Sequence, residues 1–148
     1  MLLTKQELAE KAIRAADHAE VPAELVCAII EVASGWNAAL TEWNPSTWLM
    51  NQHPIDVGEG NWIAMGTRWG ALQVRGQEAW MAGYKTLERL AETDANLEAG
   101  CMVLKKILGD ERKTLLTWFG ERKSLANRAL AILPQCKQFV EAKPCVSS

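Results

Sequence analysis

The sequence lacks the features that define several common protein classes. It has no block of about five like charges, and its net charge is only −2, so it carries no basic footprint of the kind that binds nucleic acid. No run approaches about 18 apolar residues, and the first residues lack the basic start and apolar stretch of an export signal. We therefore expect a domain with no membrane span. It is either an endolysin released by other means or a chain whose signal has been removed.

Cofactor and metal motifs are also missing. The four cysteines and two histidines show no zinc-ligand spacing, and neither a phosphate loop nor a Gly-x-Ser-x-Gly motif is present. We therefore expect no metal and no cofactor. Cys27 and Cys101 both fall on apolar stripes of predicted helices, which leaves two alternatives open: a disulfide between them, or two small buried thiols.

The hydrophobic pattern predicts a mainly α fold in one domain, residues 1–148, which we expect to be a monomer. Pro22 is expected at the first position of one helix, and Pro134 is expected to open the last one. Prolines and glycines interrupt the pattern over 35–76, which indicates loops, short turns and a minor β segment. The predicted helices cover about 4–19, 22–34, 77–90, 93–108, 110–119, 124–133 and 134–142.

Tryptophan is concentrated in this irregular segment and its border. Six of the seven tryptophans lie between positions 36 and 80. An indole offers a broad apolar face and one N–H donor, which suits stacking on a sugar ring. The competing interpretation is a small core that anchors a segment with little regular backbone structure. Both stay open at this stage.

Four segments share an order and spacing with a known family. They are AIIEVASGWN at 28–37, GTRWGALQV at 66–74, ANLEAGCMVL at 95–104 and LLTWFG at 115–120. Together they resemble the active-site segments of goose-type lysozymes and soluble lytic transglycosylases. The resemblance implies a lysozyme-like helical domain that acts on peptidoglycan or a related N-acetylated glycan. It also implies a substrate-binding cleft lined by Trp36, Asn44, Trp69, Gln73 and Trp118.

The departures from the family pattern fall on chemically important positions. Ala33 stands where the family has its catalytic Glu, and Asn44 stands where some relatives carry another Glu. Arg68 replaces a small hydroxyl residue, and Phe119 replaces an Asn. A lone Glu-to-Ala change would be typical of an engineered knock-out. Four departures favour natural divergence, and the origin of Ala33 is left open.

The family chemistry explains why Ala33 matters. One carboxylic acid protonates the glycosidic oxygen while the acetamido group of the substrate assists, so no second acid is held in reserve. A methyl group cannot transfer a proton, which costs on the order of 10² to 10⁴ in rate. Glu31 lies about 200° around the helix from Ala33 and is expected to point elsewhere. Glu42 and Glu59 are the candidate substitute acids.

Three functions remain compatible with the sequence. The first is a glycan-strand cleaving or binding domain of the lytic transglycosylase kind, inactive as it stands because the acid is missing. The second is a non-catalytic module that uses the same scaffold to hold a glycan or a protein. The third is a helical structural domain in which every tryptophan is buried.

Overall fold

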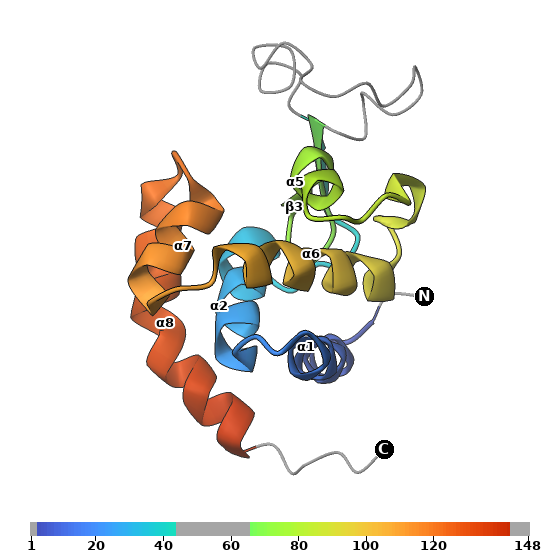
Figure 1. Cartoon of the computed structure of the whole chain (residues 1–148). Coiled ribbons are helices and arrows are strands. Elements are labelled where there is room, and N and C mark those ends of the chain that lie inside the picture. The colour runs from blue at the N-terminus through green and yellow to red at the C-terminus, as the bar shows by residue number, and fades with distance from the viewer. Residues whose placement is uncertain (1–2, 44–65, 143–148) are drawn as a thin grey trace.

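Helix α2 (Ala23–Ser34) is the apolar centre of the fold in this computed structural model, which describes residues 3–43 and 66–142. Each residue from 25 to 30 is at most 1% exposed. α2 packs mainly against α8 (Lys123–Ala142) and α1 (Lys5–Ala19). Figure 1 shows α2 running between these two helices toward the small sheet. Burial of this apolar surface is the main force that holds the helices together.

Helix α1 begins with a capping box. The Thr4 hydroxyl accepts from the Glu7 N–H at 3.1 Å, and the Glu7 carboxylate accepts from the Thr4 N–H at 3.1 Å. Each bond satisfies a backbone donor that the helix leaves without a partner. Pro22, expected as the first residue of α2, instead precedes the helix with extended backbone angles. The prediction was therefore one residue too early.

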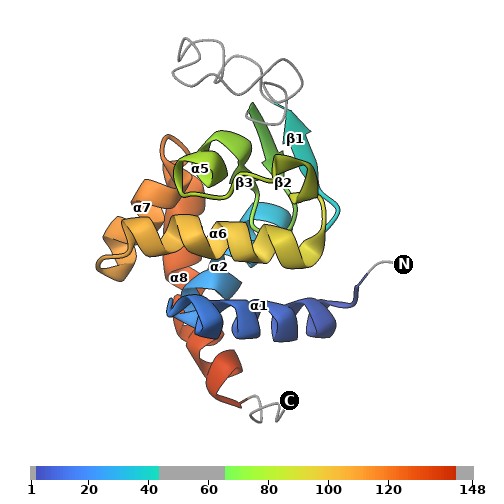
Figure 2. The ribbon, with the colours of Figure 1, turned by 45° about the vertical axis from the view of Figure 1, so that its right-hand side comes forward.

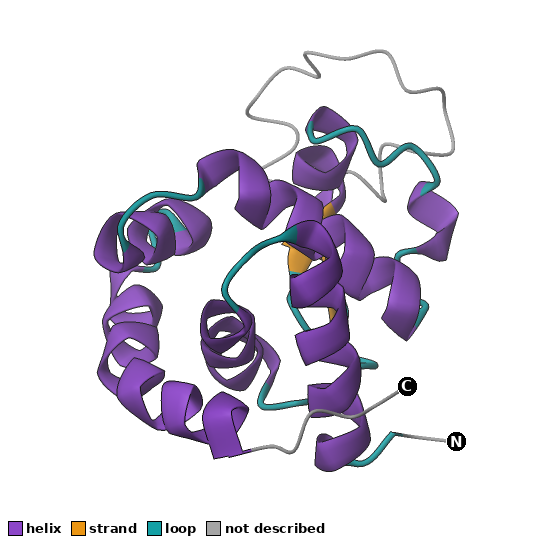
Figure 3. Ribbon diagram, turned by 60° about the horizontal axis from the view of Figure 1, so that its bottom comes forward, coloured by secondary structure: helices purple, strands orange, loops and turns teal. Residues whose placement is uncertain are grey.

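A small antiparallel sheet lies in the middle of the fold. Its order is β1 (Thr41–Trp43), β2 (Thr67–Trp69) and β3 (Val74–Arg75). Figure 2 shows these strands side by side, next to α5, and Figure 3 shows how little of the described chain is strand. The prediction of a mainly α fold with a minor β segment in the middle is confirmed.

The single helix predicted over 77–90 is wrong. The structure has a short helix α5 (Gly76–Met81), a turn, and a 3₁₀ helix η1 (Leu87–Arg89). Gly83 adopts a φ of +107°, a backbone conformation that glycine reaches without strain and that a right-handed helix cannot contain. The prediction relied on the periodic hydrophobic pattern alone, which does not show the turn at Gly83.

The two helices that follow agree with the sequence to within two residues. α6 spans Thr93–Ile107 and α7 spans Glu111–Phe119. Asp110 caps α7, as its position before the apolar pattern predicts, because its carboxylate accepts a backbone N–H of the first turn at 2.9 Å. Gly109 is not the C-cap of α6, since Leu108 takes that position with extended backbone angles.

The predicted break at Pro134 is also wrong, because α8 continues through it. Proline removes one helical hydrogen bond and is costly inside a helix. Here the flanking side chains of Ala129, Leu133 and Cys136 are buried, and the whole helix packs along α2 and α7. Tertiary packing therefore outweighs the local preference of proline. None of the described helices is long and apolar enough to cross a membrane.

The disulfide alternative for Cys27 and Cys101 is excluded by the state of Cys101. Cys101 carries a free thiol that is 1% exposed. Burial raises the pKa of this thiol to about 12. Cys101 is therefore a small buried thiol, the second of the two alternatives.

This thiol is expected to resist alkylation in the folded protein. At pH 8 only about one Cys101 in ten thousand is a thiolate, and only the thiolate attacks iodoacetamide. Peptide mass spectrometry should find Cys101 unlabelled after a short exposure in buffer and fully labelled in urea. Rapid labelling in buffer would show that the residue is open to solvent.

Candidate functional site

Gln73 joins the end of the α2 segment to the turn between β2 and β3. Its carboxamide N–H groups donate to the carbonyls of Leu40 at 2.8 Å and Gly70 at 2.9 Å. The Gly70 N–H in turn donates to the Leu40 carbonyl at 2.7 Å. Gln73 is 4% exposed and has a φ of +51°. The connection between α2 and β1 is thus held to the family-like segment at 66–74 by the Gln73 side chain and the Gly70 N–H.

Asn96 fastens α6 to the same turn. Its carboxamide nitrogen donates to the carbonyls of Trp69 at 2.6 Å and Leu90 at 3.2 Å, while its oxygen accepts from the Leu72 N–H at 3.3 Å. Asn96 is 1% exposed. A Cβ on Gly70 would approach the Asn96 carboxamide to 2.6 Å. The turn therefore needs both the left-handed backbone and the missing side chain of that glycine.

Gly100, one turn further along α6, allows the helix to approach the same turn. A Cβ at this position would meet the Leu72 side chain at 2.3 Å. The structure shows the approach to be against the β2–β3 turn.

The fourth family-like segment, 115–120, forms the last turns of α7. Trp118 is 7% exposed and Phe119 is 2% exposed, and both belong to the hydrophobic core. The Arg122 guanidinium lies 5.4 Å from the centre of the Phe119 ring. Glycan contact by Trp118 stays a prediction.

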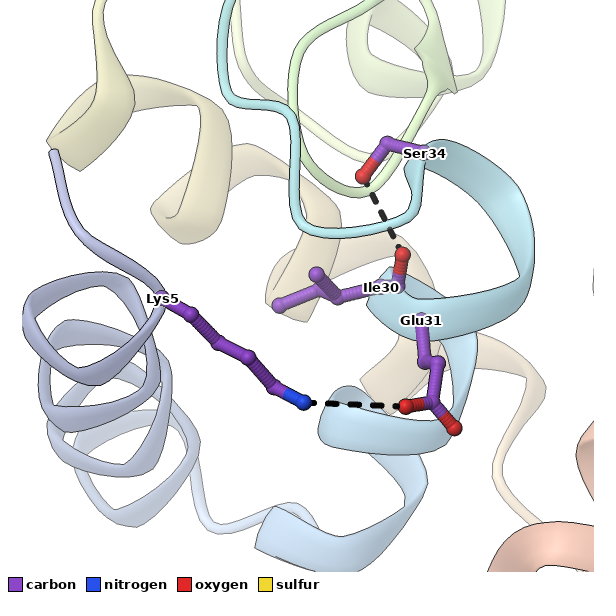
Figure 4. Close-up of polar contacts among 4 residues, drawn as sticks. All are labelled: Lys5, Ile30, Glu31 and Ser34. Carbon is purple, nitrogen blue, oxygen red and sulfur yellow. Dashed lines mark hydrogen bonds and ion pairs between the residues drawn. The ribbon is translucent and has the colours of Figure 1, made fainter. Parts of the chain in front are cut away.

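Ala33 lies in the last turn of α2, half-buried against the core. Glu31 points toward α1, where its carboxylate lies 3.9 Å from the Lys5 ammonium, as Figure 4 shows. The Ser34 hydroxyl is occupied by a bond to the Ile30 carbonyl at 3.1 Å. The helical offset thus correctly predicted that Glu31 and Ala33 lie on different faces. Glu31 is not positioned to replace the missing acid.

Trp36 follows Gly35 in the left-handed region, with a φ of +66°. That conformation is a genuine outlier for a bulky residue. Its ring lies 5.4 Å from the Lys5 ammonium and helps to line a groove of about 150 Å³ with Glu31 and Phe139. The indole N–H is buried and has no hydrogen-bond partner among the described residues. None of the other predicted binding residues lines this groove.

The remaining predicted residues lie in different settings. Trp69 is half-buried on β2, and Glu42 is exposed on β1. Asn44 and Glu59 lie outside the described residues. Glycan contact by Trp69, and a role for Glu42 as an acid, stay predictions.

A larger cavity, of about 610 Å³, lies between α1 and α6 and contains none of the predicted site residues. Its rim includes the ion pair between Lys11 and Asp94 at 3.0 Å. No three His, Cys, Asp or Glu side chains in the described ranges gather closely enough to hold a metal ion. Part of the cavity lining comes from the family-like segment 95–104, on the side of α6 that faces α1.

The sequence missed a row of charges across the sheet. Glu42, Arg68 and Arg75 occupy paired positions on β1, β2 and β3, so their side chains project from one face. Glu78 on α5 lies 3.9 Å from Arg75. Arg122, from the α7–α8 corner, is close enough for its charge to act on the rest of the group. Only the strand register, which the sequence did not reveal, could have shown this arrangement.

Burial dominates the electrostatics of this group. It lowers the pKa of Arg122 to about 10, and the charge of Arg68 adds to the effect. Burial and the charge of Arg75 also lower the pKa of Arg68. Burial raises the pKa of Glu78, although the nearby arginines oppose the shift. Arg122, with a pKa of about 10, stays protonated at neutral pH, whereas Glu78 holds its proton more tightly than an ordinary carboxyl.

Glu78→Gln is therefore expected to stabilise the protein slightly at neutral pH, because the Glu78 side chain is 41% exposed and water screens part of the burial cost. A folded-state pKa above the unfolded value means that ionised Glu78 destabilises the fold. This penalty is absent below the ordinary value of 4.5 and complete above the raised folded value. Urea unfolding should show Glu78→Gln to be more stable than the unmodified chain at pH 7.5 and equal to it near pH 3. A loss of stability at pH 7.5 would show that the ion pair with Arg75 contributes more to stability than the burial of the Glu78 carboxylate costs. Glu88→Gln, at an exposed position, is the control.

Comparison with known proteins finds no family model, curated protein or solved structure that matches this chain. The functional argument consequently rests on its own residues and their geometry.

Proposed function

We propose that this chain is a peptidoglycan-binding domain of the lytic transglycosylase kind that holds glycan strands and does not cleave them. One observation carries the proposal: two of the four family-like segments, 66–74 and 95–104, meet at the β2–β3 turn, and Leu40, three residues after the first segment, is bonded to the same turn. Gln73 and Asn96 make the hydrogen bonds that join them. Side chains matched to the family motifs are thus used to assemble the junction between the end of α2 and the sheet.

Backbone strain adds support. The described part of the chain has three non-glycine residues with positive φ, and two of them, Trp36 and Gln73, occupy family motif positions. The third, Glu20, is the C-cap of α1. A strained residue costs about 1 to 3 kcal/mol and is typical of binding and catalytic sites. The strained backbone at Trp36 and Gln73 therefore favours a role of these motif positions in binding.

The absence of cleavage follows from Ala33. Glu31 is paired with Lys5 on the other face of α2, and Glu42 is exposed on β1 opposite Arg68. Glu78 is the described carboxyl best suited to hold a proton, because its pKa is raised. If any cleavage is detected, Glu78→Gln should abolish it.

Co-sedimentation with purified insoluble peptidoglycan tests the proposal. The chain should bind saturably, and the suspension should neither lose turbidity nor release sugar products. Trp69→Ala should weaken binding by about tenfold, the size expected for losing one aromatic stacking surface. Trp80→Ala, which removes a half-buried tryptophan of α5 outside the predicted site, should bind like the unmodified chain. Circular dichroism confirms that both variants fold.

Two results would contradict the proposal. Absence of binding at high peptidoglycan concentration would favour the structural-domain alternative. Turbidity loss at a rate comparable to that of active lytic transglycosylases would show that another group replaces the acid.

A further inference from the structure

The charged row on the sheet brings positive groups together in an unfavourable way. Arg68 and Arg75 are directly opposite each other on β2 and β3, a pairing that destabilises a sheet when the charges are alike. Arg122 adds a third guanidinium, whose pKa is lowered by burial and by the charges of Arg68 and Arg75. The protein as a whole has a net charge of −2, so this concentration of positive charge is local.

The nearby carboxylates do not fully compensate these arginines. Within the described ranges, Arg75 has an ion pair with Glu78 at 3.9 Å, and neither Arg68 nor Arg122 has one. Glu42 is exposed at the edge strand, where water screens it. Glu78 is one carboxylate among three guanidinium groups, and its ion pair is with Arg75.

Arg122 also has an unused donor. Its Nε is buried and has no hydrogen-bond partner in the described part of the chain. The guanidinium rests on the Phe119 ring, which fixes its plane. An orphaned buried donor costs free energy unless a partner arrives. A guanidinium offers two parallel N–H donors to a carboxylate or phosphate group.

We propose that Arg68, Arg75 and Arg122 form a binding site for a carboxylate group on the ligand. This inference rests on the proposed function and narrows it: the preferred glycan carries free carboxylates, such as the lactyl carboxylate of N-acetylmuramic acid without its stem peptide, and a neutral N-acetylglucosamine chain is a poorer ligand. The arginine that replaces a small hydroxyl residue at position 68 thereby changes the specificity of the site. Without the catalytic acid the glycan is not cleaved, and the arginines strengthen its binding. Both changes favour binding without turnover.

Calorimetric titration with two tetrasaccharides tests the inference. One alternates N-acetylglucosamine with N-acetylmuramic acid and has free lactyl carboxylates; the other is chitotetraose. The unmodified chain should bind the acidic tetrasaccharide about tenfold or more tightly, the effect expected for charge-assisted hydrogen bonds. Arg68→Gln should remove this preference and leave the affinity for chitotetraose within about twofold.

Three further variants sharpen the test. Arg122→Lys keeps the charge and loses the paired donors, so it should reduce the preference without unfolding the chain. Glu78→Gln makes the group more positive and should increase the affinity for the acidic tetrasaccharide. Arg128→Gln removes an exposed arginine of α8 outside the group and should change nothing.

A second arm uses inorganic phosphate alone and separates this inference from the proposed function. If neither sugar binds but phosphate raises the melting temperature of the unmodified chain and not of Arg68→Gln, the anion site stands and the glycan function fails. If both sugars bind equally well and no arginine variant alters either affinity, the glycan function stands and this inference is wrong. Absence of any response to phosphate or to the acidic sugar would also overturn it.

Discussion

Replacing Asn96 with alanine is expected to lower the free energy of unfolding by about 3 to 5 kcal/mol. The carboxamide makes three hydrogen bonds, to the carbonyls of Trp69 and Leu90 and from the N–H of Leu72. Its removal leaves these backbone groups buried without partners and opens a cavity in contact with Gly70. Each unsatisfied buried group costs about 1 to 3 kcal/mol. Few single substitutions in a chain of this size have a larger effect.

Urea denaturation followed by circular dichroism measures this change. Asn127→Ala, on the exposed side of α8, is the matched control and should shift stability by less than about 0.5 kcal/mol. Gly70→Ala should resemble Asn96→Ala, because the new methyl group would collide with the same carboxamide. Gly35→Ala has a similar φ of +60° but meets nothing within 4 Å, so it should cost only about 1 kcal/mol. Equal losses for both glycine variants would show that the contact with Asn96 contributes little.

The second large effect concerns cleavage. Ala33→Glu restores a carboxyl at the position that the family resemblance assigns to the acid, and a general acid contributes about 10² to 10⁴ in rate. If the Arg68 guanidinium projects toward position 33, it favours the ionised form and removes the proton that the first step needs, so we expect this variant alone to stay weak. Ala33→Glu combined with Arg68→Ser should therefore be the more active at neutral pH.

Product release from peptidoglycan, measured from pH 4 to 8, distinguishes the two variants. The single variant should cleave best at low pH, and the double variant should extend activity toward neutral pH. Ala33→Gln has nearly the same shape without the proton and is the control for cleavage by any other group. Equal activity of the two Glu variants at every pH would show that Arg68 does not act on position 33. The argument that this site has diverged naturally would then lose its main support.

The sequence predicted the helices whose ends carry strong local signals. Thr4 with Glu7 begins α1, and Asp110 begins α7. Both depend on bonds between residues three apart, which the local sequence specifies. The sequence failed to predict two helix boundaries. Pro134 remains inside α8 because its neighbours are buried against the core. Gly83 makes a turn just after α5, within a stretch whose hydrophobic pattern is helical.

The candidate site was predictable in its parts but not in its arrangement. The sequence singled out Gln73, and the structure shows that its carboxamide is used within the fold. Trp36 was assigned to the same cleft, yet its side chain lines the groove beside Lys5. The charged row depends on which residues of three strands stand opposite each other. A register is fixed by turn geometry and packing, and no local pattern in 35–76 specifies it.

Nuclear magnetic resonance titration with the acidic tetrasaccharide tests the central claim most directly. The account predicts saturable shifts at the backbone amides of Ala33, Ser34 and residues 67–69, at the Trp69 indole N–H and at the Arg68 side chain. The α1–α6 cavity beside Lys11 should stay unchanged. Absence of shifts, or shifts confined to that cavity, would contradict glycan binding at the junction of α2 and the sheet.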